Sequence, residues 1–195
     1  ISTCYHLQMI GSEPSAYFEL TQDIDCSETD PSDPDFDAGG TWSDEKGFDP
    51  IATSVSPFSG TLAALNFTVT GVFINRPLED NVALLAFTDS AEISNMHLTD
   101  FNITGSANTS SLISIAEASN ITRINVSGIL DGGYGVGGLA AFSSSTISES
   151  YTNGALSAAD YCGGLAAYNS DQIRNSYSSI NISCSDYCGG LAAYN

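Results

Sequence analysis

Apolar residues return at a nearly constant interval along this chain. Leu139, Leu165 and Leu191 are 26 residues apart, and Leu112 precedes Leu139 by 27. A second apolar set, with gaps of 28, 26 and 26, consists of Ile93, Ile121, Ile147 and Ile173. A fixed period in the twenties is typical of a solenoid, in which each coil buries its apolar face only by stacking on its neighbours. We therefore expect each set to form one inward-facing stack.

The residues between these apolar positions predict strands. Residues 66–70, 121–126 and 173–177 are short, β-branched or aromatic segments bounded by Gly, Ser and Asn. No segment after residue 80 keeps a helical stripe for about ten residues. The pattern predicts an all-β fold, a right-handed parallel β-helix with coils of about 26 residues stacked about 4.8 Å apart.

One stretch of the repeat is exact. The decapeptide DYCGGLAAYN occupies residues 160–169 and 186–195, and a looser copy, VGGLAAF, occupies residues 136–142. The paired glycines suit a corner that needs either a positive φ angle or a close approach of two backbones. Residues that pack and turn dominate the repeat, which argues against a repeated catalytic site.

The order of these motifs resembles that of the GLUG repeat family of surface and adhesin-like proteins. The family motif reads GGLVGxN, and here Ala166 and Ala167 stand where Val and Gly are usual. Upstream, residues 6–10 resemble the family's short capping helix, residues 17–25 its first strand, Trp42 with residues 48–51 its W-x-PI segment, and residues 57–61 its pFxGt segment. The resemblance implies a secreted or surface-attached β-solenoid without agreed catalytic residues. Residues 1–57 would form the cap and an acidic loop, and residues 58–195 the coils.

The charge of the chain restricts its partners. It has 23 acidic residues against four basic ones, a net charge of −19, so nucleic acid and anionic membranes would be repelled. There is no apolar run long enough to span a membrane and no signal-peptide pattern. A chain that starts at Ile1 fits a processed mature protein or a fragment. The acidic composition and the family resemblance favour an extracellular or cell-surface location.

Asn-x-Ser/Thr sequons provide possible glycosylation sites. The six sequon asparagines are Asn66, Asn102, Asn108, Asn120, Asn125 and Asn181. Chance is an alternative explanation, because Asn, Ser and Thr are frequent at β-solenoid corners. The clustering of five of the six between residues 66 and 125 favours glycosylation of several of them.

Five cysteines fit an oxidising compartment. Cys4 and Cys26 bracket the expected capping helix and first strand, so we expect them to pair. Cys162 and Cys188 occupy the same repeat position and should stack on adjacent coils, while Cys184 competes for either partner. We predict that Cys162 or Cys184 pairs with Cys188. Buried free thiols are the alternative, and zinc is disfavoured because neither histidine has ligand spacing to a cysteine pair.

An acidic segment precedes the coils. Asp33, Asp35 and Asp37 alternate before a glycine, an arrangement that resembles a calcium loop because Ca²⁺ prefers several carboxylates around a tight turn. No glutamate follows at the twelfth position, so the segment is not an EF-hand. A solvated acidic loop is the alternative, and Ca²⁺ is the one cofactor that the sequence indicates.

The sequence predicts a structural or adhesive protein and not an enzyme, and a polysaccharide-degrading enzyme is the least favoured alternative. Asp160 and Asp186 are repeat-equivalent corner residues, and no nucleophile, phosphate-binding or metal-binding motif is present. The first hypothesis is a building block of a surface fibre, stalk or filament, completed beyond Asn195 by further repeats or by another copy of the chain. The second is an adhesin module that binds glycans or host surface proteins. Its candidate contacts are Tyr134, Tyr151, Tyr161, Tyr177 and Tyr187.

Overall fold

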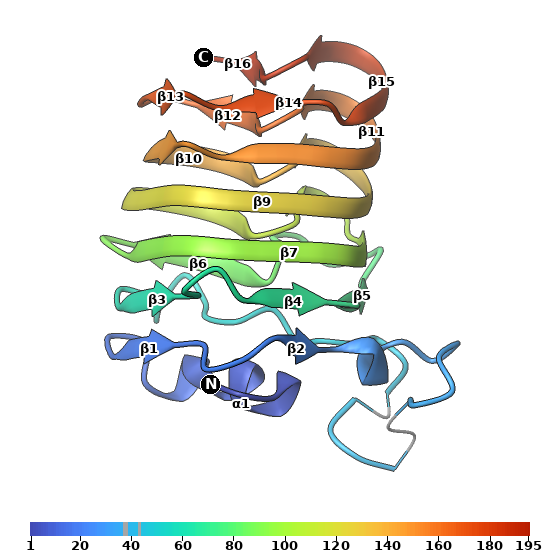
Figure 1. The fold of residues 1–195 in the computed structure, drawn as a ribbon. Helices are drawn as coiled ribbons and strands as arrows, with labels where there is room; N and C mark the ends of the chain where they lie inside the picture. Colours follow the sequence, from blue (N-terminus) through green and yellow to red (C-terminus); the bar gives the residue numbers. More distant parts are fainter. Residues whose placement is uncertain (37–38, 43) are drawn as a thin grey trace.

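The strands wind into a single stack of coils, as the sequence predicts (Figure 1). The computed structural model describes residues 1–36, 39–42 and 44–195. Among these residues sixteen strands form one sheet, and its main path runs β1-β3-β7-β9-β10-β12-β16. Pairs of strands along this path are parallel, including those of β9 with β7 and with β10. The fold is a right-handed parallel β-helix of about five turns.

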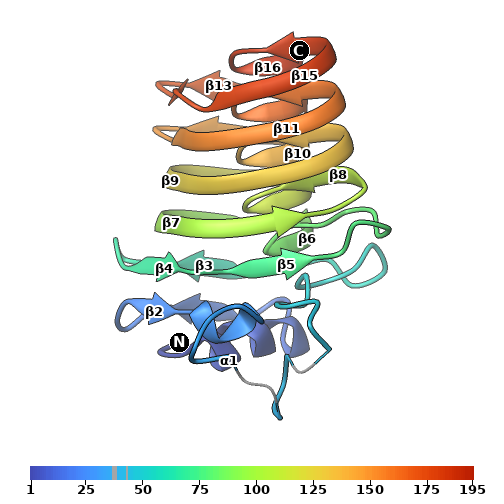
Figure 2. The same cartoon turned by 90° about the vertical axis from the view of Figure 1, so that its right-hand side faces the viewer.

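The elements follow one another from the N-terminal end of the stack to its other end (Figures 1 and 2). The first elements are α1 (Cys4–Gln8), the 3₁₀ turn η1 (Met9–Ser12), β1 (Tyr17–Glu19), β2 (Ile24–Asp25), the 3₁₀ turn η2 (Ser27–Thr29), β3 (Thr61–Ala63), β4 (Thr68–Thr70), β5 (Phe73–Asn75), β6 (Leu85–Asp89) and β7 (Glu92–Thr104). The later ones are β8 (Ala107–Ser110), β9 (Ile113–Gly137), β10 (Ala140–Ser148), β11 (Tyr151–Gly163), β12 (Ala166–Asn169), β13 (Ile173–Arg174), β14 (Tyr177–Ser178), β15 (Asn181–Gly189) and β16 (Ala192–Tyr194).

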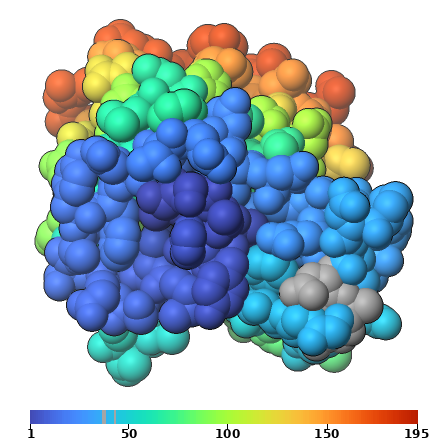
Figure 3. Space-filling view, turned by 60° about the horizontal axis from the view of Figure 1, so that its bottom comes forward, coloured from blue at the N-terminus to red at the C-terminus, as the bar shows by residue number. Residues whose placement is uncertain are grey.

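The N-terminal segment closes one end of the solenoid. Helix α1 begins after Thr3, whose Oγ1 accepts a hydrogen bond from the backbone N–H of His6 at 3.1 Å. Leu7 and Ile10 are buried beneath the first coil. Strands β1 and β2 pair with β3 and β4, so this segment also contributes the first rung of the sheet. Figure 3 shows residues of the blue N-terminal segments covering this end of the molecule.

The two predicted apolar stacks are present. Strand pairing places Ile93, Ile121, Ile147 and Ile173 in one ladder. The first three isoleucines are fully buried, as are Leu112, Leu139 and Leu165 of the leucine set. Leu191, 43% exposed, and the half-buried Ile173 lie in the outermost coil, which is covered on one side only. The proposed coil register is therefore confirmed.

The paired glycines are explained by close approach and not by φ. A side chain at Gly137 would overlap the carbonyl oxygen of Ala140, and one at Gly163 would overlap that of Ala166. The residues that do have a positive φ are mainly not glycines, and the sequence did not predict them. One such ladder, with φ between 48° and 67°, consists of Asn66, Asn95, Arg123, Glu149 and Asn175.

Several strands are longer than the four to six residues that the pattern predicts. Strand β9 continues for 25 residues because the sheet bends at its corners without losing its pairing. The predicted strand at residues 121–126 is part of β9, whereas residues 173–177 are divided between β13 and β14.

Candidate functional site

Two rows of aromatic side chains meet on one side of the later coils. The strand row contains Phe142 on β10, Tyr168 on β12 and Tyr194 on β16, which are register partners. The rings of Phe142 and Tyr168 stack at 4.2 Å with an angle of 12° between their planes, and Tyr194 lies 6.0 Å from Tyr168. The parallel pairing of successive coils therefore aligns these rings along the solenoid axis.

The corner row contains Tyr134, Tyr161 and Tyr187, which precede the paired glycines. Tyr161 and Tyr187 stack at 4.4 Å, and Tyr134 lies 5.0 Å from Tyr161. Both Tyr161 (φ 56°) and Tyr187 (φ 55°) have left-handed backbone, whereas the equivalent corner of the preceding coil uses Gly135 (φ 70°). Such a conformation costs a bulky residue on the order of 1–3 kcal/mol, so the stacking of the rings must offset this strain.

Tyr168 joins the two rows into one surface, which we call the aromatic face (Tyr134, Phe142, Tyr161, Tyr168, Tyr187 and Tyr194). Its hydroxyl oxygen lies 2.6 Å from that of Tyr134, and its ring centroid lies 5.0 Å from that of Tyr161. Burial is the main cause that raises the pKa of Tyr168 above its ordinary value, and the hydrogen bond with Tyr134 raises it further. Tyr168 therefore presents a neutral hydroxyl group at physiological pH.

A groove of about 350 Å³ lies against the strand row. Phe142, Tyr168 and Tyr194 line it, together with polar residues that include Glu117 and Asn169. Because its lining comes from β9, β10, β12 and β16, the groove crosses successive coils and follows the solenoid axis.

Asn169 contributes an unsatisfied acceptor to this region. It is 2% exposed, and its Nδ2 donates to the carbonyl of Asp171 at 2.6 Å and to Oδ1 of Asn195 at 2.9 Å. Within the described part of the chain its own Oδ1 has no hydrogen-bond partner. A buried acceptor without a partner is unfavourable, so a bound hydroxyl or amide would stabilise this position.

The tyrosines predicted from the sequence divide into two groups. Tyr134, Tyr161 and Tyr187 come together in the aromatic face. Tyr151 and Tyr177 form a separate stacked pair, 5.2 Å apart, on β11 and β14. The prediction missed the strand row, although Phe142, Tyr168 and Tyr194 are the second aromatic position of the repeat, directly after its two alanines.

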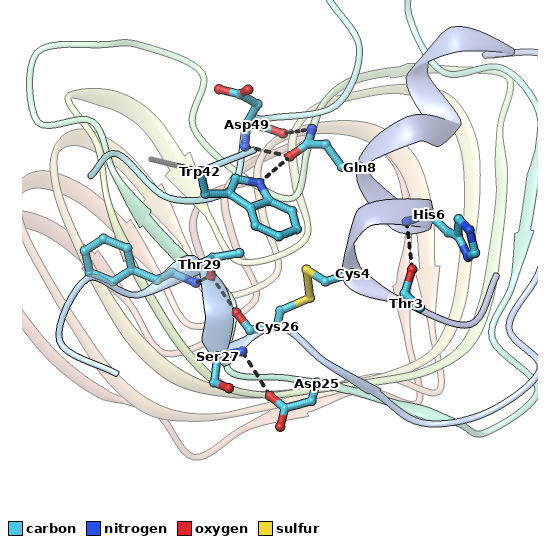
Figure 4. Close-up of a disulfide and its surroundings, with 11 residues drawn as sticks. Thr3, Cys4, His6, Gln8, Asp25, Cys26, Ser27, Thr29, Trp42 and Asp49 are labelled. Atoms are coloured by element: carbon cyan, nitrogen blue, oxygen red, sulfur yellow. Dashed lines mark hydrogen bonds between the residues drawn. A yellow bond between two sulfur atoms is a disulfide. The ribbon is translucent and has the colours of Figure 1, made fainter. Parts of the chain in front are cut away.

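The predicted Cys4–Cys26 disulfide is confirmed (Figure 4). Its Cα atoms are 5.2 Å apart, and both residues are buried. It links α1 to the residue that precedes η2 and so attaches the cap to the first rung of the sheet.

A second disulfide joins Cys162 to Cys184, with their Cα atoms 6.3 Å apart. The prediction that Cys188 takes part in this bond is wrong, because its thiol is free and exposed. Cys188 is the register partner of Cys162, and side chains of register partners lie side by side and do not point at each other. Cys184 is the register partner of Ala158, and the left-handed corner at Tyr161 lies between Ala158 and Cys162.

The second half of the acidic segment, which contains Trp42 and Asp49, is attached to the cap. Trp42, buried at 2% exposure, donates through Nε1 to Oε1 of Gln8 at 3.3 Å, and the same oxygen accepts the backbone N–H of Asp49 at 2.9 Å (Figure 4). The guanidinium of Arg76, which is 8% exposed, pairs with Asp49 and, at 3.1 Å, with Glu79. These contacts attach the segment to the end of β5.

The calcium prediction concerns the first half of the same segment. The Oδ1 atom of Asp33 accepts the backbone N–H of Asp35 at 2.9 Å, as in a common aspartate turn. Asp37 lies outside the described residues. Within the described ranges, no three His, Cys, Asp or Glu side chains are grouped so as to hold a metal ion. Calcium binding at this loop stays a prediction.

The sequon asparagines differ in accessibility. Those that are exposed are Asn66, Asn102, Asn120 and Asn181. Asn108 and Asn125 are half-buried, and their side-chain amides contact Oδ1 of Asn81 at 3.0 Å and Nδ1 of His97 at 3.2 Å. Glycosylation stays a prediction, and the four exposed asparagines are its favoured positions.

Comparison with protein families and with curated proteins finds no match for this chain. No protein-family model matches the sequence, and no similar protein is found among curated proteins. The resemblance to the GLUG repeat family therefore stays a prediction. The two disulfides indicate an oxidising environment, and the described residues contain no helix long and apolar enough to cross a membrane.

Proposed function

We propose that this chain is an extracellular structural β-solenoid, a building block of a surface fibre, stalk or filament. The observation that carries the proposal is the unbroken core. One ladder contributes one side chain per coil from the cap to the last coils, namely Phe18, Leu62, Ile93, Ile121, Ile147 and Ile173. A core of this kind maintains a straight, elongated shape, which suits a stalk or fibre.

The covalent and surface chemistry supports an extracellular role. Two disulfides are stable in oxidising compartments, and four sequon asparagines are exposed to solvent. A net charge of −19 disfavours side-by-side association, so we propose that copies or further repeats associate end to end. The coil of β15 and β16 would receive them by strand pairing, as its own strands pair with β11 and β12.

The proposed role is not catalytic. Asp160 and Asp186 are register partners on adjacent coils, and Asp186 is exposed at the corner. The two aspartates recur because the whole repeat recurs, so their recurrence is no evidence for a catalytic acid and base.

Electron microscopy and sedimentation of the full-length native protein test the proposal. We expect elongated particles that form multi-copy assemblies, with the degree of assembly dependent on salt because of the charge. Mass analysis before and after reduction and deglycosylation tests the extracellular location in parallel. A compact monomer that is unaffected by salt and chelator would contradict the structural role.

A second candidate function is a binding module that presents one side to a ligand. The aromatic face favours it, because Tyr134 is 44% exposed and Tyr194 is 65% exposed. Exposed aromatic rings next to a groove are typical of ligand-binding surfaces.

A further inference from the structure

We propose that the aromatic face and its groove bind an uncharged, linear glycan that lies along the solenoid axis. This inference rests on the second candidate function, that of a binding module, and names its site and its class of ligand.

The shape of the groove favours an extended ligand. Its volume of about 350 Å³ lies within the range of about 300–1,000 Å³ typical of ligand sites. The lining residues come from four strands of successive coils, which are spaced about 4.8 Å apart. The rings of Phe142 and Tyr168 stack face to face, so their edges form an apolar strip along this direction. A chain of similar units fits such a strip better than a compact molecule does.

The chemistry of the lining matches a sugar. The ring edges of Phe142 and Tyr168 and the exposed ring of Tyr194 provide an apolar surface for the C–H groups of a pyranose. Beside them lies Asn169, whose buried Oδ1 has no hydrogen-bond partner among the described residues and would gain one from a sugar hydroxyl that reaches it. One of the two hydroxyl protons of Tyr134 and Tyr168 forms the hydrogen bond between their oxygens. The other hydroxyl proton remains available to donate to a ligand oxygen.

The charge of the molecule selects an uncharged ligand over anionic ones. The chain carries a net charge of −19, and Glu117 lies in the groove itself. An anionic polysaccharide, a nucleic acid or a second copy of the chain would be repelled at this surface.

The backbone of the corner row supports a role for its rings. Tyr161 and Tyr187 adopt a left-handed conformation that Gly135 adopts without strain one coil earlier. Here the strain holds two additional rings against Tyr168 and extends the aromatic face.

Binding of the full chain to a panel of linear polysaccharides tests the proposal. The panel contains neutral β-1,4-glucan, β-1,4-mannan, β-1,4-xylan, β-1,3-glucan and dextran, with polygalacturonate as the anionic comparison. We expect retardation of the protein in gels that contain at least one neutral polymer, and calorimetric binding of the matching hexasaccharide. No binding to any neutral polymer, or equal binding to polygalacturonate, would overturn the proposal.

Three variants assign the binding to the aromatic face. Tyr134→Ala and Tyr194→Ala should each weaken binding of the hexasaccharide by up to about tenfold, because each removes one aromatic surface. Tyr177→Ala is the matched control, since Tyr177 is 59% exposed but belongs to the separate pair with Tyr151. Circular dichroism and melting temperature verify that each variant is folded.

The outcomes separate this inference from the structural proposal. Unchanged affinity in both face variants, or an equal loss in Tyr177→Ala, would overturn the glycan site. Self-association that Tyr134→Ala abolishes would assign the face to a second copy and would equally overturn it, because Tyr134 on β9 lies outside the terminal coil. The elongated shape seen by electron microscopy does not depend on these side chains, so its loss or persistence tests the structural role alone.

Discussion

The early and late coils of this solenoid fill the same interior with different chemistry. One ladder of register partners crosses both regions and contains, in order, Ile24, Val69, Leu98, Val126, Thr152 and Ser178. Its first four members are apolar and its last two carry hydroxyl groups. The largest buried aromatic side chains all belong to the early region, namely Trp42, Phe48, Phe58 and Phe101.

Hydroxyl groups in the later region bind the backbone of the next coil. Ser111 Oγ donates to the carbonyl of Gly138, and Thr152 Oγ1 donates to that of Gly164, both at 2.6 Å. Ser150 receives similar support, because its backbone N–H donates to Oγ of Ser176 at 3.0 Å. Two of these three bonds join residues that are 27 or 26 positions apart in the sequence, which is the length of one coil.

The difference explains why the sequence repeat is strict in one region only. Hydrogen bonds between coils are directional and favour a constant geometry, and the last three copies of the repeat keep a spacing of 26. Apolar burial is not directional, and the early coils therefore tolerate spacings of 28 and variable loops. The comparison predicts that the early region depends on volume and the later region on hydrogen-bond register.

The largest effect is expected from an early aromatic residue. Phe101→Ala should lower the free energy of unfolding by about 3–5 kcal/mol, because it leaves a cavity in a closely packed apolar interior. Urea denaturation measures the change. Leu78→Ala is the control, since Leu78 is 94% exposed and its truncation should change stability by less than about 0.5 kcal/mol. Similar values for the two variants would contradict a volume-dependent core.

The two disulfides offer a matched comparison, because both close 22-residue separations. Loop entropy therefore predicts that each contributes about 3 kcal/mol. Replacing Cys4 and Cys26 by alanine should cost more than this, because both side chains are fully buried and their loss also reduces packing. Replacing Cys162 and Cys184 should cost only the contribution of loop entropy, about 3 kcal/mol, because Cys184 is only half-buried. Thermal melts of the two double variants decide, and a larger cost for the later pair would refute the ranking.

An exchange at one ladder position distinguishes the two interiors directly. Thr152→Val removes the donor to Gly164 and the 2.8 Å contact with Ser178, and should cost about 1–3 kcal/mol. Val126→Thr places a hydroxyl in the apolar part of the same ladder and should cost a similar amount. Denaturation of both variants and of the double exchange measures these costs. A stabilising effect of either single exchange would show that the ladder position is not specified by its region.

The sequence predicted the fold because its signals are periodic. Leucines and isoleucines at equal spacing defined the register, and this register is the one observed. The bond between Cys162 and Cys184 was not predictable in the same way, because it joins residues that are not register partners and depends on the bend of the chain at Tyr161. The left-handed corners were missed since tyrosine and arginine give no local signal for positive φ.

The site was predicted in part for the same reason. Three tyrosines of the corner row were named from the sequence, but their contact with the strand row follows from the three-dimensional path of the chain. Tyr168 occupies the junction, and only the hydrogen bond and ring contacts that it makes there show that one surface exists.

Tyr168 also gives the later region a dependence on pH. Because its pKa is raised by burial and by the bond with Tyr134, the folded state favours the neutral phenol. Its contribution to stability is complete below the unfolded pKa of about 10 and is lost as the pH rises above that value. The melting temperature should therefore fall above pH 10, and less steeply in Tyr168→Phe. Parallel curves for the two proteins would contradict this assignment.

The smallest effect is expected at Cys188, which continues a ladder of Val82, Thr109, Val136 and Cys162. Its thiol is exposed and unpaired, so Cys188→Ser should change stability by less than about 0.5 kcal/mol. Titration of the native protein with a thiol reagent should label one cysteine, and the variant none, whereas reduction and unfolding should expose all five. Labelling at Cys184 in the native protein would show that the later disulfide exchanges with Cys188, its neighbour on the same strand, and that the hydroxyl-rich coils open more readily than the apolar ones.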